Sequence, residues 1–367
     1  MPSQNSFLNR IASFTSLFHK LGIDGFYTTN LTDIFYFTGL KLSKGQLYIL
    51  KNGSILVVDS RYIAIAQKQA PVKVLLLAED SYLKLFDEFS KKKLRVLGFD
   101  TQSSLYSDIT LLKKHLAAAK KKSARGQSVR LKPLNAPISQ VRMVKGPAEI
   151  RKLKESAKLL WNGFCYIKKI LKTGMTESDV ALEFEMYCRK NGAESLSFDP
   201  IVAFGLNSAY PHHKTGSKKL RSGEVVLLDL GVFLNGYASD MTRIIFHGKV
   251  CKELHHFFEI VKKAHGAALE KCRPGAYVKD LDLAARKEME KVGLEHLFIH
   301  NLGHGVGLDI HEHPFLRSQN KKDVLLPGMV ITIEPGIYLP EVGGIRYEDM
   351  IVITKKGYQN LFEDTPV

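Results

Sequence analysis

Two apolar, strand-like segments of this sequence are each interrupted by one acidic residue. Asp229 stands inside VVLLDLGVFL, and Glu334 stands inside MVITIEPG. Aspartate is disfavoured in strands, and buried carboxylates are almost never unpaired. For Asp229 alone, an ordinary strand-end aspartate is the simpler explanation, but Glu334 repeats the same anomaly. The pattern therefore favours a fold that brings buried carboxylates together.

The surroundings of these two residues form a weak internal repeat. Glycines stand at the same offsets in GEVVLLDLG and GMVITIEPG. Each segment is followed by a second acidic strand, SDMTRIIF with Asp240 and RYEDMIVIT with Glu348. Two related halves would each bring two carboxylates to a shared centre.

The first half reads as a hairpin. Its turn is Asn235-Gly236, a pair that favours a type I′ turn because both residues must take φ > 0. A two-residue turn there places Leu234 opposite Tyr237 and Asp229 opposite Thr242. Asp240 then lies diagonal to Asp229 on one face, about 7–8 Å away at Cα. Two like charges on a buried face repel and are costly to desolvate, and a cation between them removes both penalties.

The length of 367 residues predicts two domains. The first part alternates strand and helix patterns, which indicates an α/β domain. Strands are expected at 46–50, 54–58, 73–77 and 94–99, and helices at 61–69 and 82–92. Later apolar residues recur at helical spacing between strand-rich blocks, so the second part is expected to be α+β. Its helices are expected at 147–167, 177–191, 252–271 and 278–292. We place the boundary near residues 133–146, with domains 1–135 and 136–367.

Most of the net charge of +16 belongs to the first domain. Residues 1–145 hold 23 Lys+Arg and 9 Asp+Glu, a difference of +14. Contact with nucleic acid or an anionic surface would suit such a charge. The segment lacks a glycine-aromatic RNA motif and zinc-finger spacing, so we favour a solvated basic face and expect no nucleic-acid partner. The stretch 117–128 is poor in bulky apolar residues and is expected to be an exposed loop or linker.

The cellular compartment is inferred from what the sequence lacks. No run reaches the roughly 18 apolar residues of a membrane span, and residues 1–20 show no signal-peptide pattern. The four cysteines form no CxxC motif, which suits free thiols in a reducing compartment. We expect a cytoplasmic protein that does not contact the membrane.

Several motifs of the second part together resemble the pita-bread metallopeptidases, specifically the Xaa-Pro peptidases (aminopeptidase P and prolidase). In order along the chain, the matching segments are NSAYPHH, VLLDLG, GYASDMTR, HNLGHGVGLDIHEHP, GMVITIEPGIY and GIRYEDMIVIT. The resemblance implies five metal ligands: Asp229, Asp240, His304, Glu334 and Glu348. It further implies that Asp240 and Glu348 bridge two metals, that Asp229 completes one site, and that His304 and Glu334 complete the other.

The first part resembles the same group more loosely. DIFYFTGL, VVDSRYIAIAQ and QVRMVKGPAEIRKLKESA look like the amino-terminal domain of creatinase and the Xaa-Pro peptidases and the beginning of their catalytic domain. Methionine aminopeptidases lack this first domain, and creatinase lacks the metal ligands. The resemblance thus implies a creatinase-type α/β domain followed by an α+β pita-bread catalytic domain.

The implied ligand set is rich in oxygen and therefore suits two divalent ions, manganese first, with cobalt or zinc as alternatives. Such a pair activates water and polarises the scissile carbonyl. By resemblance, Glu334 also handles the proton, while His212 and His311 contact the substrate. Arg346 would orient carboxylates from behind, as its bidentate guanidinium allows. Tyr338 is a further candidate for such a supporting contact.

The function that the resemblance implies is hydrolysis of the peptide bond before proline. We put first an Xaa-Pro aminopeptidase, which releases the N-terminal residue from peptides with proline in second position. The alternative is an Xaa-Pro dipeptidase (prolidase), because the motifs are shared. A non-catalytic pita-bread binding protein is a third possibility, but no ligand is missing here. The family also suggests a homodimer.

Overall fold

The computed structural model describes residues 4–78, 81–122 and 128–362 of the chain. The chain divides into two compact units, Met1–Val141 and Arg142–Val367. Each has a buried hydrophobic cluster of its own, as expected at this length. The boundary after residue 135 stays a prediction. Among the described helices, none combines the length and apolarity needed to cross a membrane.

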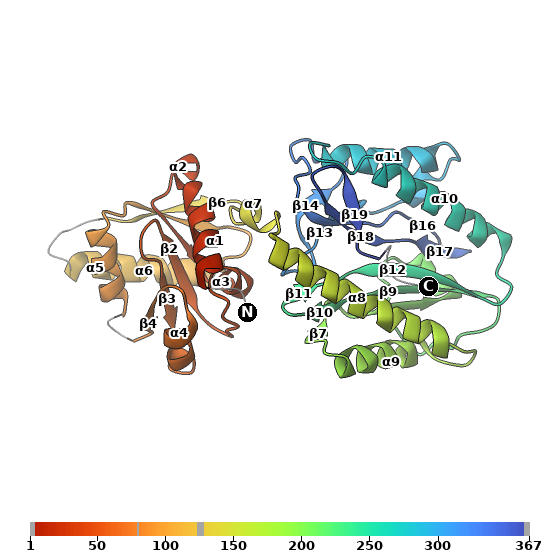
Figure 1. The fold of residues 1–367 in the computed structure, drawn as a ribbon, viewed down its shortest axis with the longest axis horizontal. Coiled ribbons are helices and arrows are strands. Elements are labelled where there is room, and N and C mark those ends of the chain that lie inside the picture. The colour runs from red at the N-terminus through yellow and green to blue at the C-terminus, as the bar shows by residue number, and fades with distance from the viewer. Residues whose placement is uncertain (1–3, 79–80, 123–127, 363–367) are drawn as a thin grey trace. The chain divides into compact units, whose positions relative to one another are not determined.

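A six-stranded mixed sheet forms the centre of the N-terminal unit (Figure 1). Its order is β4 (Lys73–Leu76), β3 (Ile55–Val58), β2 (Gln46–Leu50), β1 (Gly25–Thr28), β5 (Val96–Asp100) and β6 (Arg130–Leu134). Strands β2 and β3, both at predicted positions, form an antiparallel hairpin with Gln46 opposite Val57. In its turn Gly53 has φ +69°, a conformation that glycine adopts without strain.

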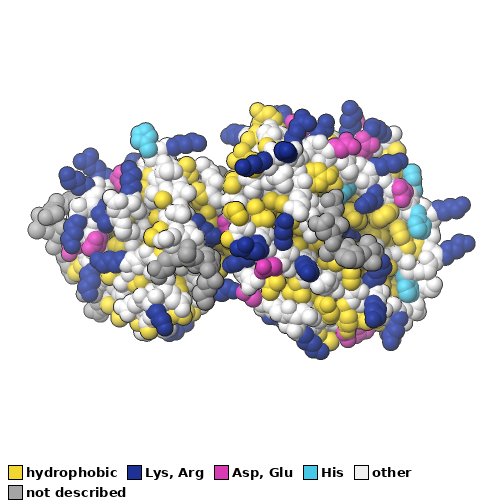
Figure 2. All heavy atoms as spheres, in the orientation of Figure 1, with side chains coloured by type: hydrophobic (Ala, Val, Ile, Leu, Met, Phe, Trp, Pro, Cys, Tyr) yellow, Lys and Arg dark blue, Asp and Glu magenta, His cyan; other side chains and the backbone are white. Residues whose placement is uncertain are grey.

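Helices alternate with these strands, which gives the predicted α/β class. They are α1 (Gln4–Ser16), α2 (Phe18–Leu21), α3 (Leu31–Thr38), α4 (Ile63–Gln69), α5 (Ser81–Lys91), α6 (Tyr106–Lys122) and α7 (Ser139–Arg142). The buried ring of Phe14 on α1 lies 5.1 Å from that of Phe26 on β1, so α1 packs against the sheet. Figure 2 shows Lys and Arg side chains spread over the visible face of this unit rather than gathered in one patch.

The expectation of a loop at 117–128 is wrong for its first part. Helix α6 continues through Lys122, while residues 123–127 lie outside the described residues. Alanine and lysine are strong helix formers, so a stretch poor in bulky apolar residues can still be helical. Ile109, Leu112 and Ala119 are buried on this helix, which holds it against the unit.

The four helices predicted for the C-terminal unit are confirmed. They are α8 (Pro147–Ile170), α9 (Glu177–Lys190), α10 (Lys252–Leu269) and α11 (Val278–Glu290). Figure 1 shows α8 and α9 on one side of the strands of this unit, with α10 and α11 on the other. Helix α9 begins with a capping box, in which Thr176 and Asp179 each accept a hydrogen bond from the other's backbone N–H.

The predicted hairpin register is also confirmed. Strands β9 (Glu224–Leu230) and β12 (Met241–His247) place Asp229 opposite Thr242. Strands β10 (Val232–Leu234) and β11 (Tyr237–Ala238) place Leu234 opposite Tyr237. Asn235 and Gly236 have φ of 54° and 78°, as a type I′ turn requires.

One feature of this hairpin was not expected: it is divided between two sheets at Gly231. Strand β9 lies between β12 and β8 (Ile201–Phe204), whereas β10 lies between β11 and β7 (Ser195–Leu196). A Cβ at Gly231 would collide with the Ser197 hydroxyl and the Ser239 backbone. Only glycine therefore permits the chain to change sheets here.

The second half of the C-terminal unit contains a five-stranded sheet and a two-stranded sheet. The larger has the order β14 (Glu312–Leu316), β13 (Gly303–Gly305), β15 (Val330–Ile333), β18 (Asp349–Ile353) and β19 (Tyr358–Asn360). The smaller pairs β16 (Gly336–Leu339) with β17 (Gly343–Arg346). Glu334 follows β15 and Glu348 precedes β18, and these strands are antiparallel partners. Each half of the repeat thus presents two acidic residues from one pair of strands.

Candidate metal centre

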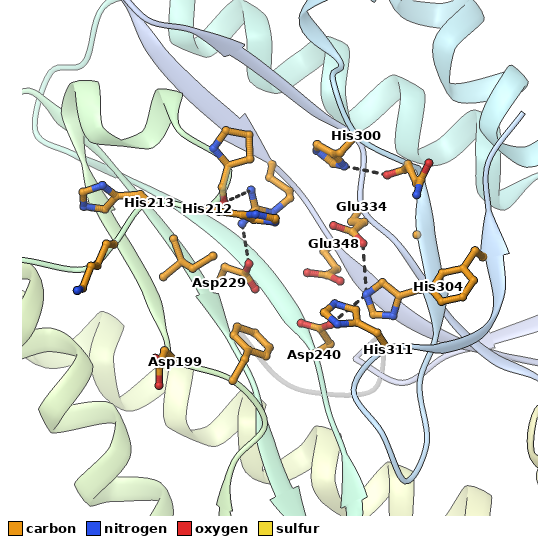
Figure 3. A pocket seen from close by; sticks show the side chains of 18 residues that line it. Asp199, His212, His213, Asp229, Asp240, His300, His304, His311, Glu334 and Glu348 are labelled. Carbon is orange, nitrogen blue, oxygen red and sulfur yellow. Dashed lines mark hydrogen bonds and ion pairs between the residues drawn. The ribbon is translucent and has the colours of Figure 1, made fainter. Parts of the chain in front are cut away.

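A cavity of about 640 Å³ opens between the two halves of the C-terminal unit. Its lining includes all five predicted metal ligands, together with His212, His311 and Arg346. Figure 3 shows Asp229, Asp240, His304, His311, Glu334 and Glu348 around one space, contributed by segments of both halves. Tyr338 is not among the lining residues. The structure thus places each predicted site residue at this cavity except Tyr338, which lies behind it.

Three of the predicted ligands form a tight buried group. Ligand atoms of Asp240, His304 and Glu348 all lie within 4.8 Å of one another. Asp240 stands just before β12, His304 lies in β13, and Glu348 stands just before β18. Strand ends from three segments far apart in sequence therefore supply two carboxylates and one imidazole to one point.

The imidazole of His304 presents one ring nitrogen to the acidic cluster. Its Nδ1 lies 3.0 Å from the Gly305 carbonyl oxygen, and a carbonyl can only accept, so Nδ1 carries the proton. The lone pair is then on Nε2, which lies 3.5 Å from Asp240 Oδ2 and 3.4 Å from Glu334 Oε1. Burial and the neighbouring His311 lower the pKa of His304 to about 3. The ring is neutral, so these contacts are not ion pairs, and the Nε2 lone pair is placed where it could bind a cation.

Asp229 is held from one side and open on the other. Its Oδ2 accepts a hydrogen bond from Arg346 Nη2 at 2.6 Å. Its Oδ1 is buried and has no hydrogen-bond partner among the described residues. A buried carboxylate oxygen without a partner is costly. A cation in the cavity would satisfy it.

Burial and mutual repulsion raise the pKa values of three acidic residues of this cluster, Asp240, Glu334 and Glu348. Burial and the charge of Glu348 raise the pKa of Asp240 and that of Glu334 well above their ordinary values. Burial and Asp229 raise the pKa of Glu348 to about 8, although a hydrogen bond from the Thr242 hydroxyl lowers it. Divalent cations would favour the ionised forms. The oxygen-rich donor set and the orphaned Asp229 oxygen both fit a metal pair.

Arg346 links the cluster to Tyr338, which the sequence singled out, and to Thr242 and His300, which it did not. Its guanidinium donates to the Thr242 hydroxyl at 3.0 Å and to the Tyr338 hydroxyl at 2.8 Å. Tyr338 in turn lies 2.9 Å from His300 Nε2. The hairpin register already placed Thr242 opposite Asp229, so that residue could have been found. His300 begins the segment HNLGHGVGLDIHEHP, so that motif could have drawn attention to it, but only the fold brings it to Tyr338.

The predicted substrate histidines occupy different surroundings. The His311 ring lies 4.3 Å from the His304 ring, and burial lowers the pKa of His311. His212 is exposed in the cavity. Its neighbour His213 lies farther out in Figure 3, where Nε2 is 2.8 Å from the buried carboxylate of Glu177. His212 is thus free to meet a ligand, whereas His213 is held in a structural contact.

Comparison with known proteins agrees with this architecture. Residues 10–144 match the creatinase/prolidase N-terminal domain, and residues 151–355 match metallopeptidase family M24. An Xaa-Pro dipeptidase of Pyrococcus horikoshii is 33% identical over 363 residues, which are 98% of each chain.

Two solved structures are similar over most of the chain. The Xaa-Pro dipeptidase from Bacillus anthracis has a TM-score of 0.90 at 31% identity and covers 98% of this chain and 99% of its own. The X-Pro aminopeptidase from Thermotoga maritima has a TM-score of 0.83 at 30% identity and covers 94% and 96%. The predicted fold, a creatinase-type α/β domain followed by an α+β pita-bread domain, is confirmed. The chain belongs to metallopeptidase family M24, whose members use divalent metal, and it carries a creatinase/prolidase N-terminal domain.

Proposed function

We propose that this chain is an Xaa-Pro dipeptidase that hydrolyses the peptide bond before proline. The metallopeptidase class follows from the family, and the preference for dipeptides is the proposed step. The sequence alone put the aminopeptidase first, but the relatives favour the alternative. Two relatives that are named Xaa-Pro dipeptidases are 32–33% identical to this chain over 96–98% of its length. The relatives support the dipeptide preference, and the cavity in which all five carboxylate and imidazole positions meet supports metal-dependent hydrolysis.

We assign the metal positions as the resemblance implies. Asp240 and Glu348, whose ligand atoms belong to the 4.8 Å group, would bridge two ions. Asp229 would complete one site with its open Oδ1, and Glu334 and His304 Nε2 would complete the other. When bound, such a pair activates a water nucleophile and polarises the scissile carbonyl.

The chain's own groups handle protons and charge. Glu334, ionised when the metal pair is bound, would take a proton from the attacking water and pass it to the prolyl nitrogen as the C–N bond breaks. His311 is neutral near pH 7 because its pKa is lowered. It and His212 would each donate an N–H to the oxygen that becomes negative in the transition state. Arg346 holds Asp229 in place from behind.

Recognition of proline must depend on shape. The prolyl nitrogen carries no hydrogen in a peptide, so no N–H can be read there. The apolar side chains of Phe198, Ile201, Pro211 and Phe315 line the cavity beside the acidic cluster. These side chains provide surface for the ring and for the preceding residue.

Manganese as the ion, the homodimer and the cytoplasmic location stay predictions. So does the absence of a nucleic-acid partner. Peptides with proline in second position are the expected substrates whether the protein is a dipeptidase or an aminopeptidase.

The test is turnover of Ala-Pro and of Ala-Pro-Ala by metal-free protein that has been reloaded with manganese, cobalt or zinc. We expect no hydrolysis in excess chelator, recovery with metal, and a higher kcat/KM for Ala-Pro. A higher kcat/KM for the tripeptide would show that the protein is an Xaa-Pro aminopeptidase instead. Full hydrolysis by protein shown to be metal-free by elemental analysis would exclude the metal mechanism.

A further inference from the structure

Residues 211–215 enter the cavity as a segment that is fastened at alternate positions. The Pro211 carbonyl accepts from Arg346 Nη1 at 3.4 Å, and His213 Nε2 lies 2.8 Å from Glu177. Thr215 donates to the Pro200 carbonyl at 2.6 Å and accepts from the Val202 N–H at 2.9 Å. The Pro211 carbonyl and the side chains of His213 and Thr215 therefore hold this segment to the rest of the protein.

The even-numbered residues of this segment are left for the cavity. His212 and Lys214 are both exposed, and both line it. His212 is the residue proposed above to contact substrate. The fastened segment thus places an ammonium group two residues from that histidine.

Two residues of the described cavity lining, Lys214 and Arg346, carry a permanent positive charge. Arg346 is 3% exposed and already donates to Asp229, Thr242 and Tyr338, so Lys214 is the cation that a substrate can reach. The described residues show no ion pair or hydrogen bond for the Lys214 ammonium, not even with Asp199, the exposed acid of the same lining. A cation held beside a catalytic cavity without an internal partner can bind an anionic group of the substrate.

We propose that Lys214 binds a carboxylate of the substrate and so sets the preference of the enzyme for charged Xaa-Pro substrates. This inference rests on the proposed function for its substrate class. Two carboxylates are chemically equivalent here: the C-terminal carboxylate of a dipeptide, next to the scissile bond, and an acidic side chain of the residue before proline. The experiment separates them.

The first measurement compares substrates that differ only in one carboxylate. The ratio of kcat/KM for Ala-Pro over Ala-Pro-amide reports the C-terminal group, and Glu-Pro-amide over Gln-Pro-amide reports the side chain. We expect Lys214→Gln to lower one of these ratios about fivefold, the size of an exposed charge pair, and Lys214→Arg to restore it. The ratio that falls identifies the carboxylate.

Lys219→Gln is the matched control, because Lys219 is exposed in the same loop but does not line the cavity. It removes the same charge and should leave both ratios unchanged. Equal ratios in wild type and Lys214→Gln, or equal losses in Lys214→Gln and Lys219→Gln, would overturn the inference.

A binding measurement keeps the two proposals apart. An Ala-Pro analogue with CH2 in place of the scissile carbonyl is titrated into metal-loaded protein by calorimetry, beside its amide and the corresponding Glu-Pro-amide and Gln-Pro-amide analogues. We expect Lys214→Gln to weaken one carboxylate-bearing analogue about fivefold relative to its neutral partner. If the wild type hydrolyses no Xaa-Pro substrate, the proposed function fails, while this titration still decides whether Lys214 binds a carboxylate.

Discussion

Glu348 and Asp349 are neighbours in sequence, but their carboxylates lie in two opposite regions of the C-terminal unit. The Glu348 carboxylate faces the cavity, and burial and Asp229 raise its pKa to about 8. Asp349 accepts from Arg243 Nη2 at 2.6 Å and from Asn360 Nδ2 at 2.8 Å. Burial raises the pKa of Asp349, but Arg243, His265 and Asn360 together outweigh that effect, so the pKa is lowered.

His311 and Glu312 repeat this contrast. His311 faces the cavity, whereas Glu312 accepts from Lys145 Nζ at 2.6 Å and from Arg142 Nη2 at 2.7 Å. These two cations lower the pKa of Glu312 against the effect of burial. Burial alone therefore does not mark a site. Asp349 and Glu312, which have partners on both carboxylate oxygens, support the fold, whereas acids that face the cavity are free to hold metal.

Glu348→Gln gives the largest expected effect on activity. It removes a proposed bridging charge, so the metal pair is lost and kcat/KM falls by at least about 10³-fold. Metal-free Glu348→Gln should be no less stable than the metal-free wild type, because a repelling carboxylate is gone. Metal content, turnover and thermal unfolding check this. Retention of two metals and wild-type turnover would contradict the assignment of Glu348.

Asp349→Asn is the matched change in the other region. It leaves the buried Arg243 without its charge partner, so we expect a loss of about 3–5 kcal/mol in the free energy of unfolding. The folded variant should still bind both metals. Chemical denaturation measures the free energy of unfolding, and elemental analysis measures the metal content. A variant that is as stable as the wild type but has lost its metals would show that the two regions do not differ in this way.

Tyr338→Phe tests the contacts behind the site. It removes the hydroxyl between Arg346 and His300 and keeps the ring, so we expect a loss of about tenfold in kcat/KM or metal affinity. Tyr237→Phe removes a comparable hydrogen bond to Glu149, away from the cavity, and should retain wild-type kinetics. Similar kinetics in both variants would show that Tyr338 has no special role.

The pH dependence of stability should differ between the regions. Glu348 has a pKa of about 8 in the folded chain against an ordinary 4.5, so between these values the folded state binds more protons than the unfolded state. The metal-free protein should therefore lose stability as pH rises from about 4.5 to 8. Asp349 and Glu312, whose pKa values are lowered, contribute stability that is lost only as pH falls below their ordinary values. Thermal unfolding across pH 5–8 tests the first effect.

The metal-loaded wild type should not lose stability as the pH rises over this range. The metal-free Glu348→Gln variant should lose less stability than the metal-free wild type. Stability of the metal-free wild type that rises over the same range would mean that these acids are ionised and paired, as Asp349 is.

Local patterns determined much of the fold in advance. Helical spacing predicted α8 to α11, and the Asn235-Gly236 turn predicted the register that places Asp229 opposite Thr242. These features depend on periodicity and turn chemistry, which are properties of neighbouring residues. The error at 117–122 has the same origin, since a helix needs few bulky apolar residues when alanine and lysine favour it.

Which acid is paired, and by what, was decided only by the tertiary structure. The sequence singled out Glu348 through a motif, but nothing near Asp349 announces Arg243, which lies 106 residues away along the chain. The same is true of His300 at Tyr338, and of the Lys214 ammonium, for which the described residues show no partner. Periodicity determines which face of an element a side chain occupies, whereas its partner depends on which distant element packs there, and that packing sets the pKa and the chemistry of each buried charge.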